Sequence, residues 1–128
     1  MKILVIDDEQ GSHEIAKAIY GKENIISVYN GKEGIEAIEK YDPDAILLDI
    51  MMPICSGNDV LQYFRKNKKV LRKIVTITGS ADGISLASKY GLSGNIWKPF
   101  NRKQLKKIVQ RVFDGKKEEK QKFTIQKI

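Results

Sequence analysis

Short apolar runs alternate with segments in which apolar residues recur at helical spacing along nearly the whole chain. The apolar runs are typical of strands and cover residues 2–6, 25–29, 45–49, 73–78 and 94–97. The periodic segments predict helices and cover residues 12–20, 30–40, 57–66, 82–90 and 101–113. Because the strands are continuously apolar and alternate with helices, we predict an α/β fold with a doubly wound, five-stranded parallel sheet and helices on both faces.

The last predicted helix carries the clearest apolar stripe of the chain. Asn101 is a suitable N-cap for it, and the stripe consists of Leu105, Ile108, Val109, Val112 and Phe113. The periodic pattern stops there, and the sequence becomes highly charged. We therefore predict a folded domain over residues 1–113 and a charged C-terminal tail or linker over residues 114–128. The composition of the tail fits a linker, a helical extension or the start of a further domain.

The composition is typical of a single globular domain without a disulfide or a membrane span. The chain has 128 residues, of which 41% are hydrophobic, enough for one domain with its own core. The single cysteine, Cys55, excludes a disulfide within the chain and fits a reducing compartment. Because no apolar run approaches the roughly 18 residues that cross a membrane, we expect no membrane span and a cytoplasmic location.

The charge of +7 is divided unevenly along the chain. Residues 1–64 contain 5 Lys and 12 Asp or Glu, a net charge of −7. Residues 65–128 contain 18 Lys or Arg and 4 Asp or Glu, a net charge of +14. The acidic half suits a cation, and the basic half suits an acidic partner, although a solvated surface also explains many of the lysines.

Charged and hydroxyl side chains stand where the predicted strands end. The first strand runs into Asp7 and Asp8, the third ends at Asp49, the fourth at Thr78, and Lys98 follows the fifth. Because the carboxyl ends of parallel strands share one edge of the sheet, these groups should converge. Clustered carboxylates repel one another unless a cation is present, and hard oxygen ligands favour Mg²⁺. A lysine and a hydroxyl beside that cation suit a phosphoryl group, and a carboxylate can act as its nucleophilic acceptor.

Each of these residues has an ordinary structural explanation when it is taken alone. Asp8 or Glu9, for example, is explained equally well as a helix cap, and an Asp after a strand is common. The combination on four strand ends is what favours a functional site over separate structural roles.

Four motifs together resemble the receiver domain of response regulators, the phospho-acceptor module of two-component signalling. They are "VIDDE" (5–9), "LLDIMMPICSG" (47–57), "TITGS" (76–80) and "WKPF" (97–100). The resemblance spans residues 1 to about 113 and implies a flavodoxin-like strand order 2-1-3-4-5. It also implies a regulatory switch rather than a multi-turnover enzyme, with at most self-phosphorylation from small phosphodonors and autodephosphorylation.

The resemblance assigns the metal and the phosphoryl group to specific residues. Asp49 would be phosphorylated, and Mg²⁺ would be held by Asp7, Asp8, Asp49 and the backbone carbonyl of Met51. Around the phosphoryl group, Thr78 and the N–H of Gly79 would donate hydrogen bonds, and Lys98 would pair with its charge. A cis peptide bond would join Lys98 to Pro99.

Three positions depart from the family pattern or lie outside it. Asn95 stands three residues before Lys98, where the family usually has an aromatic residue that reports phosphorylation. His13 is expected to be a surface residue of the first helix, and Cys55 a loop or helix-end residue without a catalytic role. The segment between Thr78 and Lys98 also looks slightly shorter than the corresponding segment in the family, which suggests a trimmed fourth helix or loop.

The expected partners are proteins. The resemblance implies a histidine kinase or phosphotransfer protein as phosphodonor, and a downstream protein on the face formed by the fourth helix, fifth strand and fifth helix. It is compatible with a monomer or a phosphorylation-dependent dimer. No DNA-reading motif is visible, so direct binding to nucleic acid is not expected. The alternative hypothesis is a receiver-like interaction module whose acidic site is unused and whose basic face binds its partner constitutively.

Overall fold

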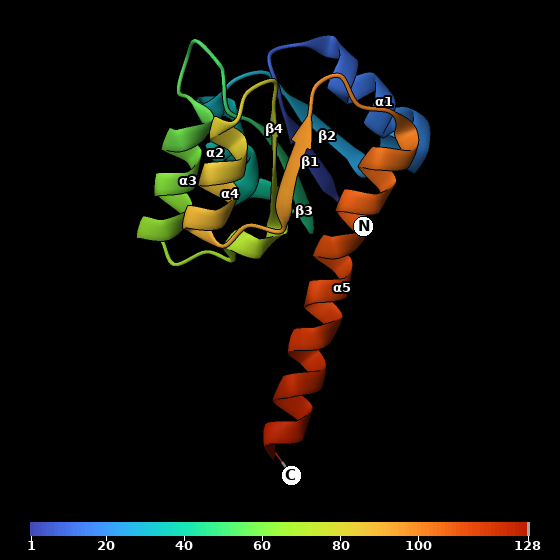
Figure 1. Ribbon diagram of the computed structural model, residues 1–128, viewed down its shortest axis with the longest axis vertical. Helices are drawn as coiled ribbons and strands as arrows, with labels where there is room; N and C mark the ends of the chain where they lie inside the picture. The colour runs from blue at the N-terminus through green and yellow to red at the C-terminus, as the bar shows by residue number, and fades with distance from the viewer. Residues whose placement is uncertain (128) are drawn as a thin grey trace.

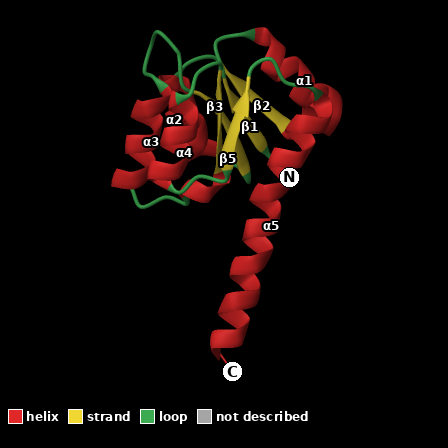
Figure 2. Ribbon diagram, in the orientation of Figure 1, coloured by secondary structure: helices red, strands yellow, loops and turns green. Residues whose placement is uncertain are grey.

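A five-stranded parallel sheet forms the centre of the molecule (Figures 1 and 2). The computed structural model describes the backbone of residues 1–127 and the side chains of residues 1–115. The spatial order of the strands is β2-β1-β3-β4-β5, which confirms the predicted fold. The strands are β1 (Ile3–Ile6), β2 (Ile25–Val28), β3 (Ala45–Asp49), β4 (Ile74–Thr78) and β5 (Gly94–Trp97).

One helix follows each strand. The helices are α1 (Gln10–Tyr20), α2 (Gly31–Tyr41), α3 (Gly57–Lys66), α4 (Asp82–Tyr90) and α5 (Arg102–Lys127), with short 3₁₀ turns η1 (Lys22–Asn24) and η2 (Leu71–Lys73). Side-chain caps fix several of the helix starts. Asn30 caps α2, Ser56 forms a capping box with Asp59 at α3, and Asn101 accepts the N–H of Gln104 at α5. Cys55 lies in the loop just before this α3 cap, as expected.

The helices cover the sheet in two layers, and each layer encloses its own core. Helices α2, α3 and α4 lie on one side, and α1 and α5 lie on the other (Figure 1). Alternate strand residues supply the two cores: Leu4 and Leu48 face the first, and Val5 and Leu47 face the second. The strands are buried on both faces, which agrees with the prediction made from their continuously apolar sequences.

The last helix extends well beyond the segment predicted from periodicity. It begins as expected after Asn101, but its backbone continues past Phe113 to Lys127 and projects from the amino-terminal edge of the sheet (Figure 1). The helix therefore has no break at residue 113, and the division between a domain and a charged tail remains a prediction. Among the described residues, none of the helices combines the length and apolar character needed to span a membrane.

Candidate metal and phospho-acceptor site

The strand register explains why distant acidic residues meet at the carboxyl edge of the sheet. Ile6 at the end of β1 pairs with Leu48 of β3. The next residue in each strand is therefore at the same level, which brings Asp7 beside Asp49. On the other side of β3, Thr78 of β4 pairs with Trp97 of β5, so that Lys98 leaves the sheet near the same edge.

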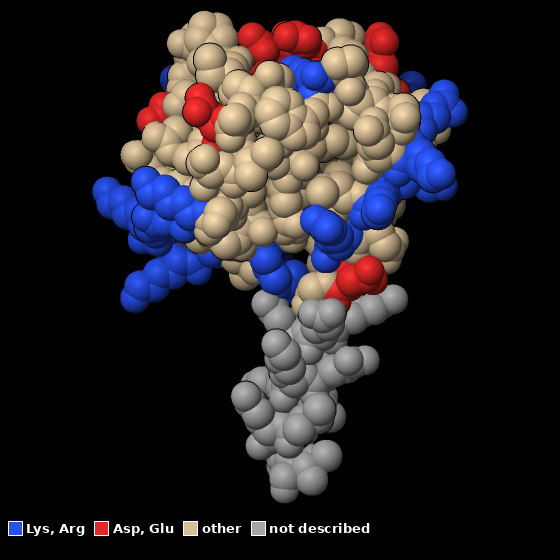
Figure 3. Space-filling model, viewed as in Figure 1, with Lys and Arg blue, Asp and Glu red and all other residues tan. Residues whose placement is uncertain are grey.

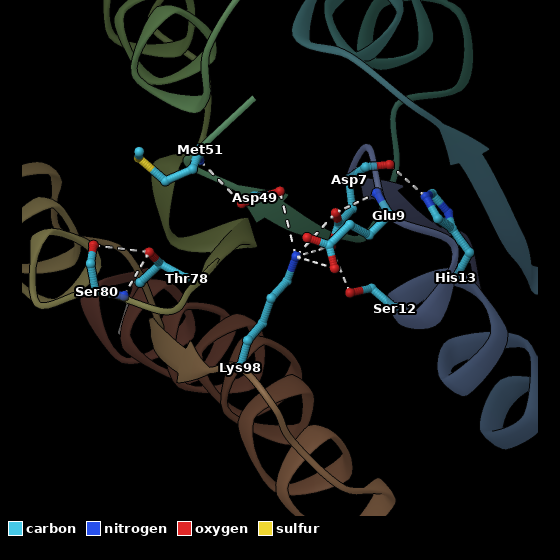
Figure 4. Close-up of polar contacts among 9 residues, drawn as sticks. All are labelled: Asp7, Glu9, Ser12, His13, Asp49, Met51, Thr78, Ser80 and Lys98. Carbon is cyan, nitrogen blue, oxygen red and sulfur yellow. Dashed lines mark hydrogen bonds and ion pairs between the residues drawn. The ribbon is translucent and has the colours of Figure 1, made fainter. Parts of the chain in front are cut away.

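Lys98 connects the two buried carboxylates (Figure 4). Its Nζ lies 3.0 Å from Oδ2 of Asp7 and 3.5 Å from Oδ2 of Asp49, with Glu9 Oε2 at 3.8 Å. Asp7 and Asp49 are 0% and 3% exposed, respectively. Charges this deeply buried require compensation, and the lysine from the far end of the sequence provides it. A cis peptide bond joins Lys98 to Pro99, as predicted.

The two buried carboxylates differ in their tendency to hold a proton. Burial and the neighbouring charge of Asp7 raise the pKa of Asp49 to about 7. Burial also acts to raise the pKa of Asp7, but hydrogen bonds from Ser12, the Glu9 N–H and Lys98 outweigh it, and the net shift is downward. Burial acts to lower the pKa of Lys98, but the acids around it raise the pKa overall. Asp7 is thus the firmly ionised member of the pair.

Three carboxyl groups come close enough to share one cation. One oxygen from each of Asp7, Asp8 and Asp49 lies within 4.8 Å of the others. Asp8 is exposed, so this cluster opens to solvent on one side. Met51 contributes its backbone N–H, which donates to Oδ1 of Asp49 at 3.1 Å, while its side chain is 67% exposed. This all-oxygen set of acidic groups has the chemistry that Mg²⁺ requires.

Thr78 is near the site, but its hydroxyl is turned toward another residue. The Thr78 Oγ1 accepts the N–H of Ser80 at 3.2 Å and lies 3.2 Å from the Ser80 hydroxyl. Figure 4 shows this pair on the opposite side of Asp49 from Asp7. Gly79 between them has open space around its Cα, since an added Cβ would meet nothing within 4 Å. The fourth strand therefore presents a threonine and an accessible backbone beside Asp49.

Asn95 packs inward beneath α4. Its Oδ1 accepts the Thr76 hydroxyl at 2.8 Å, and its buried Nδ2 has no hydrogen-bond partner among residues 1–115. A Cβ placed on Gly83, in the first turn of α4, would lie 2.3 Å from both Asn95 Oδ1 and Thr78 Cγ2. The start of α4 is thus in direct contact with the threonine of the site and with the residue that replaces the usual aromatic.

We expect Gly83→Ala to disturb this contact more than the same change at a matched glycine. Overpacking of this kind typically costs about 1–3 kcal/mol, to be measured as the free energy of unfolding in urea. Gly11 is the second residue of α1 as Gly83 is of α4, and its Cβ position is open. Gly11→Ala should therefore be neutral or stabilising, since alanine favours a helix. Equal effects in both variants would contradict the tight packing.

His13 is buried, so the expectation of a surface residue was wrong. It is 0% exposed, its Nε2 lies 2.8 Å from the backbone oxygen of Asp7, and its Nδ1 lies 2.9 Å from Ser27 Oγ. Burial lowers the pKa of His13. The sequence reasoning also missed Ser12, whose hydroxyl donates to Asp7 at 2.6 Å. The available signal was the position of Ser12 one helical turn after the acids, on the side facing the sheet.

The uneven charge of the sequence is visible on the folded surface. Figure 3 shows most acidic side chains near the edge where the strands end at their carboxyl termini, and most basic side chains on the two flanks and the lower part of the same face, with one basic group among the acids at the top. The acidic site and most of the basic surface therefore lie on different parts of the molecule, as the two halves of the sequence predicted.

Comparison with known proteins agrees with this geometry. The family model described as "Response regulator receiver domain" matches residues 3–110. A protein named "Probable transcriptional regulator ycf27" from Pyropia yezoensis is 32% identical over 114 residues, covering 87% of this chain and 46% of its own. The similar protein from Porphyra purpurea gives the same identity and coverage. The chain thus spans about half the length of these curated relatives.

Solved structures share the fold at lower sequence identity. The chemotaxis response regulator CheY4 of Vibrio cholerae is 23% identical with a TM-score of 0.75, covering 87% of this chain and 97% of that one. NtrX from Brucella abortus is 22% identical with a TM-score of 0.84, covering 98% of this chain but 30% of its own. Receiver domains are regulatory and bind Mg²⁺ in an acidic pocket. Because the family model matches residues 3–110, most of this chain, the chain belongs to the response regulator receiver domain family.

Proposed function

We propose that the domain is a phospho-acceptor switch that receives a phosphoryl group on Asp49 from a histidine kinase or a phosphotransfer protein. The observation that carries this proposal is the convergence of Asp7, Asp49 and Lys98, with the lysine ammonium 3.0 Å and 3.5 Å from the two carboxylates. A buried nucleophilic carboxylate beside a cation and a potential metal ligand is what phosphoryl transfer to an aspartate requires.

The proposed cofactor is Mg²⁺, held by the side chains of Asp7, Asp8 and Asp49 and the backbone carbonyl of Met51. The clustering of three carboxyl oxygens within 4.8 Å supports this assignment. When bound, the ion would neutralise negative charge on the carboxylates and on the incoming phosphoryl oxygens.

Each protein group of the site would have a separate role in phosphoryl transfer. An oxygen of Asp49 forms a bond to phosphorus as the bond from phosphorus to the donor's imidazole nitrogen breaks, and the bonding electrons remain on that nitrogen. Lys98 lies next to Asp49 and would balance the charge of the transferred group. Thr78 would turn its hydroxyl from Ser80 toward a phosphoryl oxygen, and the backbone N–H of Gly79, an exposed residue, would donate a second hydrogen bond.

Two surface features support protein partners. A groove beside the site is lined by the start of α1 and by the turn after β5, including Ile15, Lys98 and Phe100, and would receive the phosphodonor protein. On the α4-β5-α5 face, Trp97 is 45% exposed and borders a groove with Lys107 and Arg111. We propose this second groove for a downstream protein with acidic residues; a monomer and a phosphorylation-dependent dimer both fit.

A second candidate function is a constitutive interaction module. The inward packing of Asn95 and the Ser80-bound hydroxyl of Thr78 favour it, because neither side chain is already directed toward Asp49. In that case partner affinity would be the same in Asp49→Ala as in the wild type, with or without phosphodonor. A phosphodonor-dependent affinity that disappears in Asp49→Ala would support the switch instead.

The direct test of the switch is exposure of the purified domain to acetyl phosphate with and without Mg²⁺. We expect the intact mass to rise by one phosphoryl group only with Mg²⁺, and the modification to map to Asp49. Beryllofluoride, which mimics an acyl phosphate, should change the fluorescence of Trp97, the only tryptophan of the chain. If neither a mass gain nor a Mg²⁺-dependent fluorescence change appears, the proposed function is wrong.

A further inference from the structure

Asp7 is held from the α1 side by two consecutive residues outside the four receiver motifs. The Ser12 hydroxyl donates to Asp7 Oδ2 at 2.6 Å, and His13 Nε2 lies 2.8 Å from the Asp7 backbone oxygen. Ser12 is 5% exposed and His13 is 0% exposed. The two side chains therefore fix the carboxylate and the backbone of the same residue from within the protein (Figure 4).

His13 connects this contact to the neighbouring strand. Its second ring nitrogen lies 2.9 Å from Ser27 Oγ in β2, and its ring packs against Tyr29 with centroids 4.5 Å apart. Because the carbonyl of Asp7 can only accept, Nε2 carries the hydrogen and donates to it. In the neutral ring Nδ1 then accepts from the Ser27 hydroxyl. The ring thus joins α1, the end of β1 and β2 in one hydrogen-bonded unit.

The carboxylate of Asp7 is oriented by donors from its own end of the chain. Oδ1 accepts the Glu9 N–H at 2.9 Å, and Oδ2 accepts the Ser12 hydroxyl. The remaining acceptor positions face Lys98, which contacts both oxygens at 3.2 Å and 3.0 Å. Each oxygen of the Asp7 carboxylate is thus held by one donor from residues 9–12 and also contacts the lysine of the site.

We propose that Ser12 and His13 are positioning residues for Asp7, which set the affinity of the site for a divalent cation without contacting the cation. Ser12 holds the carboxylate rotamer, and His13 holds the backbone from which that rotamer projects. This inference rests on the proposed function because it uses the same acidic site. Removal of partners that orient a metal ligand commonly weakens metal binding about 10- to 100-fold.

The test compares Mg²⁺ affinity by titration calorimetry in the wild-type domain, Ser12→Ala, Ser12→Thr and Ser85→Ala. Ser85 is an exposed serine of α4 and serves as the matched control. We expect Ser12→Ala to bind Mg²⁺ about tenfold more weakly, Ser12→Thr to recover most of the affinity because it retains the hydroxyl, and Ser85→Ala to match the wild type. Affinity in Ser12→Ala equal to that of the wild type would overturn the role of Ser12.

His13 needs a variant that separates positioning from folding. His13→Gln can still donate to the Asp7 carbonyl from its amide, whereas His13→Leu cannot. We expect His13→Gln to bind Mg²⁺ more tightly than His13→Leu when both are folded by circular dichroism. If His13→Leu does not fold, His13→Gln is compared with the wild type. A loss in His13→Gln as large as that in Ser12→Ala would then overturn the role of the Nε2 donor.

A second readout separates positioning from a general structural defect. At saturating Mg²⁺, the rate of phosphorylation of Ser12→Ala by acetyl phosphate should match the wild type, because Asp49 and Lys98 are unchanged. A rate that stays low at every Mg²⁺ concentration would overturn the positioning role. The calorimetric result does not depend on phosphorylation, so a wild-type domain that binds Mg²⁺ but accepts no phosphoryl group would refute the proposed function alone.

Discussion

Asp49→Asn should abolish Mg²⁺-dependent incorporation of a phosphoryl group from acetyl phosphate. Asparagine is nearly the same shape, so the Oδ1 that accepts the Met51 N–H is retained, but its amide is not a nucleophile. Intact-mass spectrometry is the measurement. Asp114→Asn changes an exposed carboxyl group on α5 and is the control, which should be labelled like the wild type. Labelling of Asp49→Asn at the wild-type level would place the acceptor elsewhere.

The same substitution should also change how stability depends on pH. The folded protein retains the Asp49 proton up to a pKa of about 7, whereas the ordinary value is 3.8. Between these values the folded state binds more protons than the unfolded state, so the Asp49 contribution to stability falls as the pH rises. Asparagine cannot ionise and lacks this decline.

The free energy of unfolding of Asp49→Asn, measured without metal, should therefore increase relative to the wild type from about pH 4 to pH 7 and then level off. A difference on the order of 4 kcal/mol is expected above pH 7, from a pKa difference of about three units at about 1.4 kcal/mol per unit. Comparison of the two proteins removes the opposing contribution of His13, whose lowered pKa makes stability rise with pH just below 6.5. A pH-independent difference would show that Asp49 ionises normally in the folded protein.

Lys98→Ala should separate metal binding from the response to modification. Without metal, the variant leaves Asp7 and Asp49 buried with no lysine between them, and loss of one partner of a buried ion pair typically costs about 3–5 kcal/mol. Mg²⁺ should restore much of this stability, because it would supply positive charge to the same carboxylates. The variant should therefore retain Mg²⁺ binding.

Its response to beryllofluoride should nevertheless be largely lost, because no ammonium group remains to pair with the added charge. Thermal unfolding with and without Mg²⁺ and the fluorescence of Trp97 provide the two measurements. Lys103→Ala, an exposed lysine of α5, is the control and should behave like the wild type. A full fluorescence response in Lys98→Ala would refute the proposed role of Lys98.

The fold was predictable because its signals are local. Continuous apolar strands, helical periodicity and caps such as Asn101 lie within short stretches of sequence, and the structure follows them closely. The convergence of Asp7, Asp49 and Lys98 was predictable as well, since parallel strands bring their carboxyl ends to one edge.

Side-chain direction was less predictable because it depends on partners far away in the sequence. One of the two hydrogen-bond partners of the buried His13 ring is Ser27, 14 residues later. The inward position of Asn95 depends on Thr76 in the neighbouring strand. Periodicity assigns a residue to the face of a helix or strand, but it does not specify which hydrogen bonds its side chain makes.

The continuation of α5 beyond the core, residues 116–127, is a helical extension that we call the arm. Leu105, Val109 and Val112 anchor the first part of this helix in the core, and residues 116–127 add about 18 Å of helix beyond it, at 1.5 Å per residue. A tilt of about 10° at the anchor would displace the far end by about 3 Å. Gly115 lies between the two parts, against the Arg72 side chain, and glycine is the most flexible residue in a helix. The arm should therefore bend most easily at Gly115. With alanine at this position the helix would bend less there, and a larger part of a tilt of the anchored segment would reach residues 116–127.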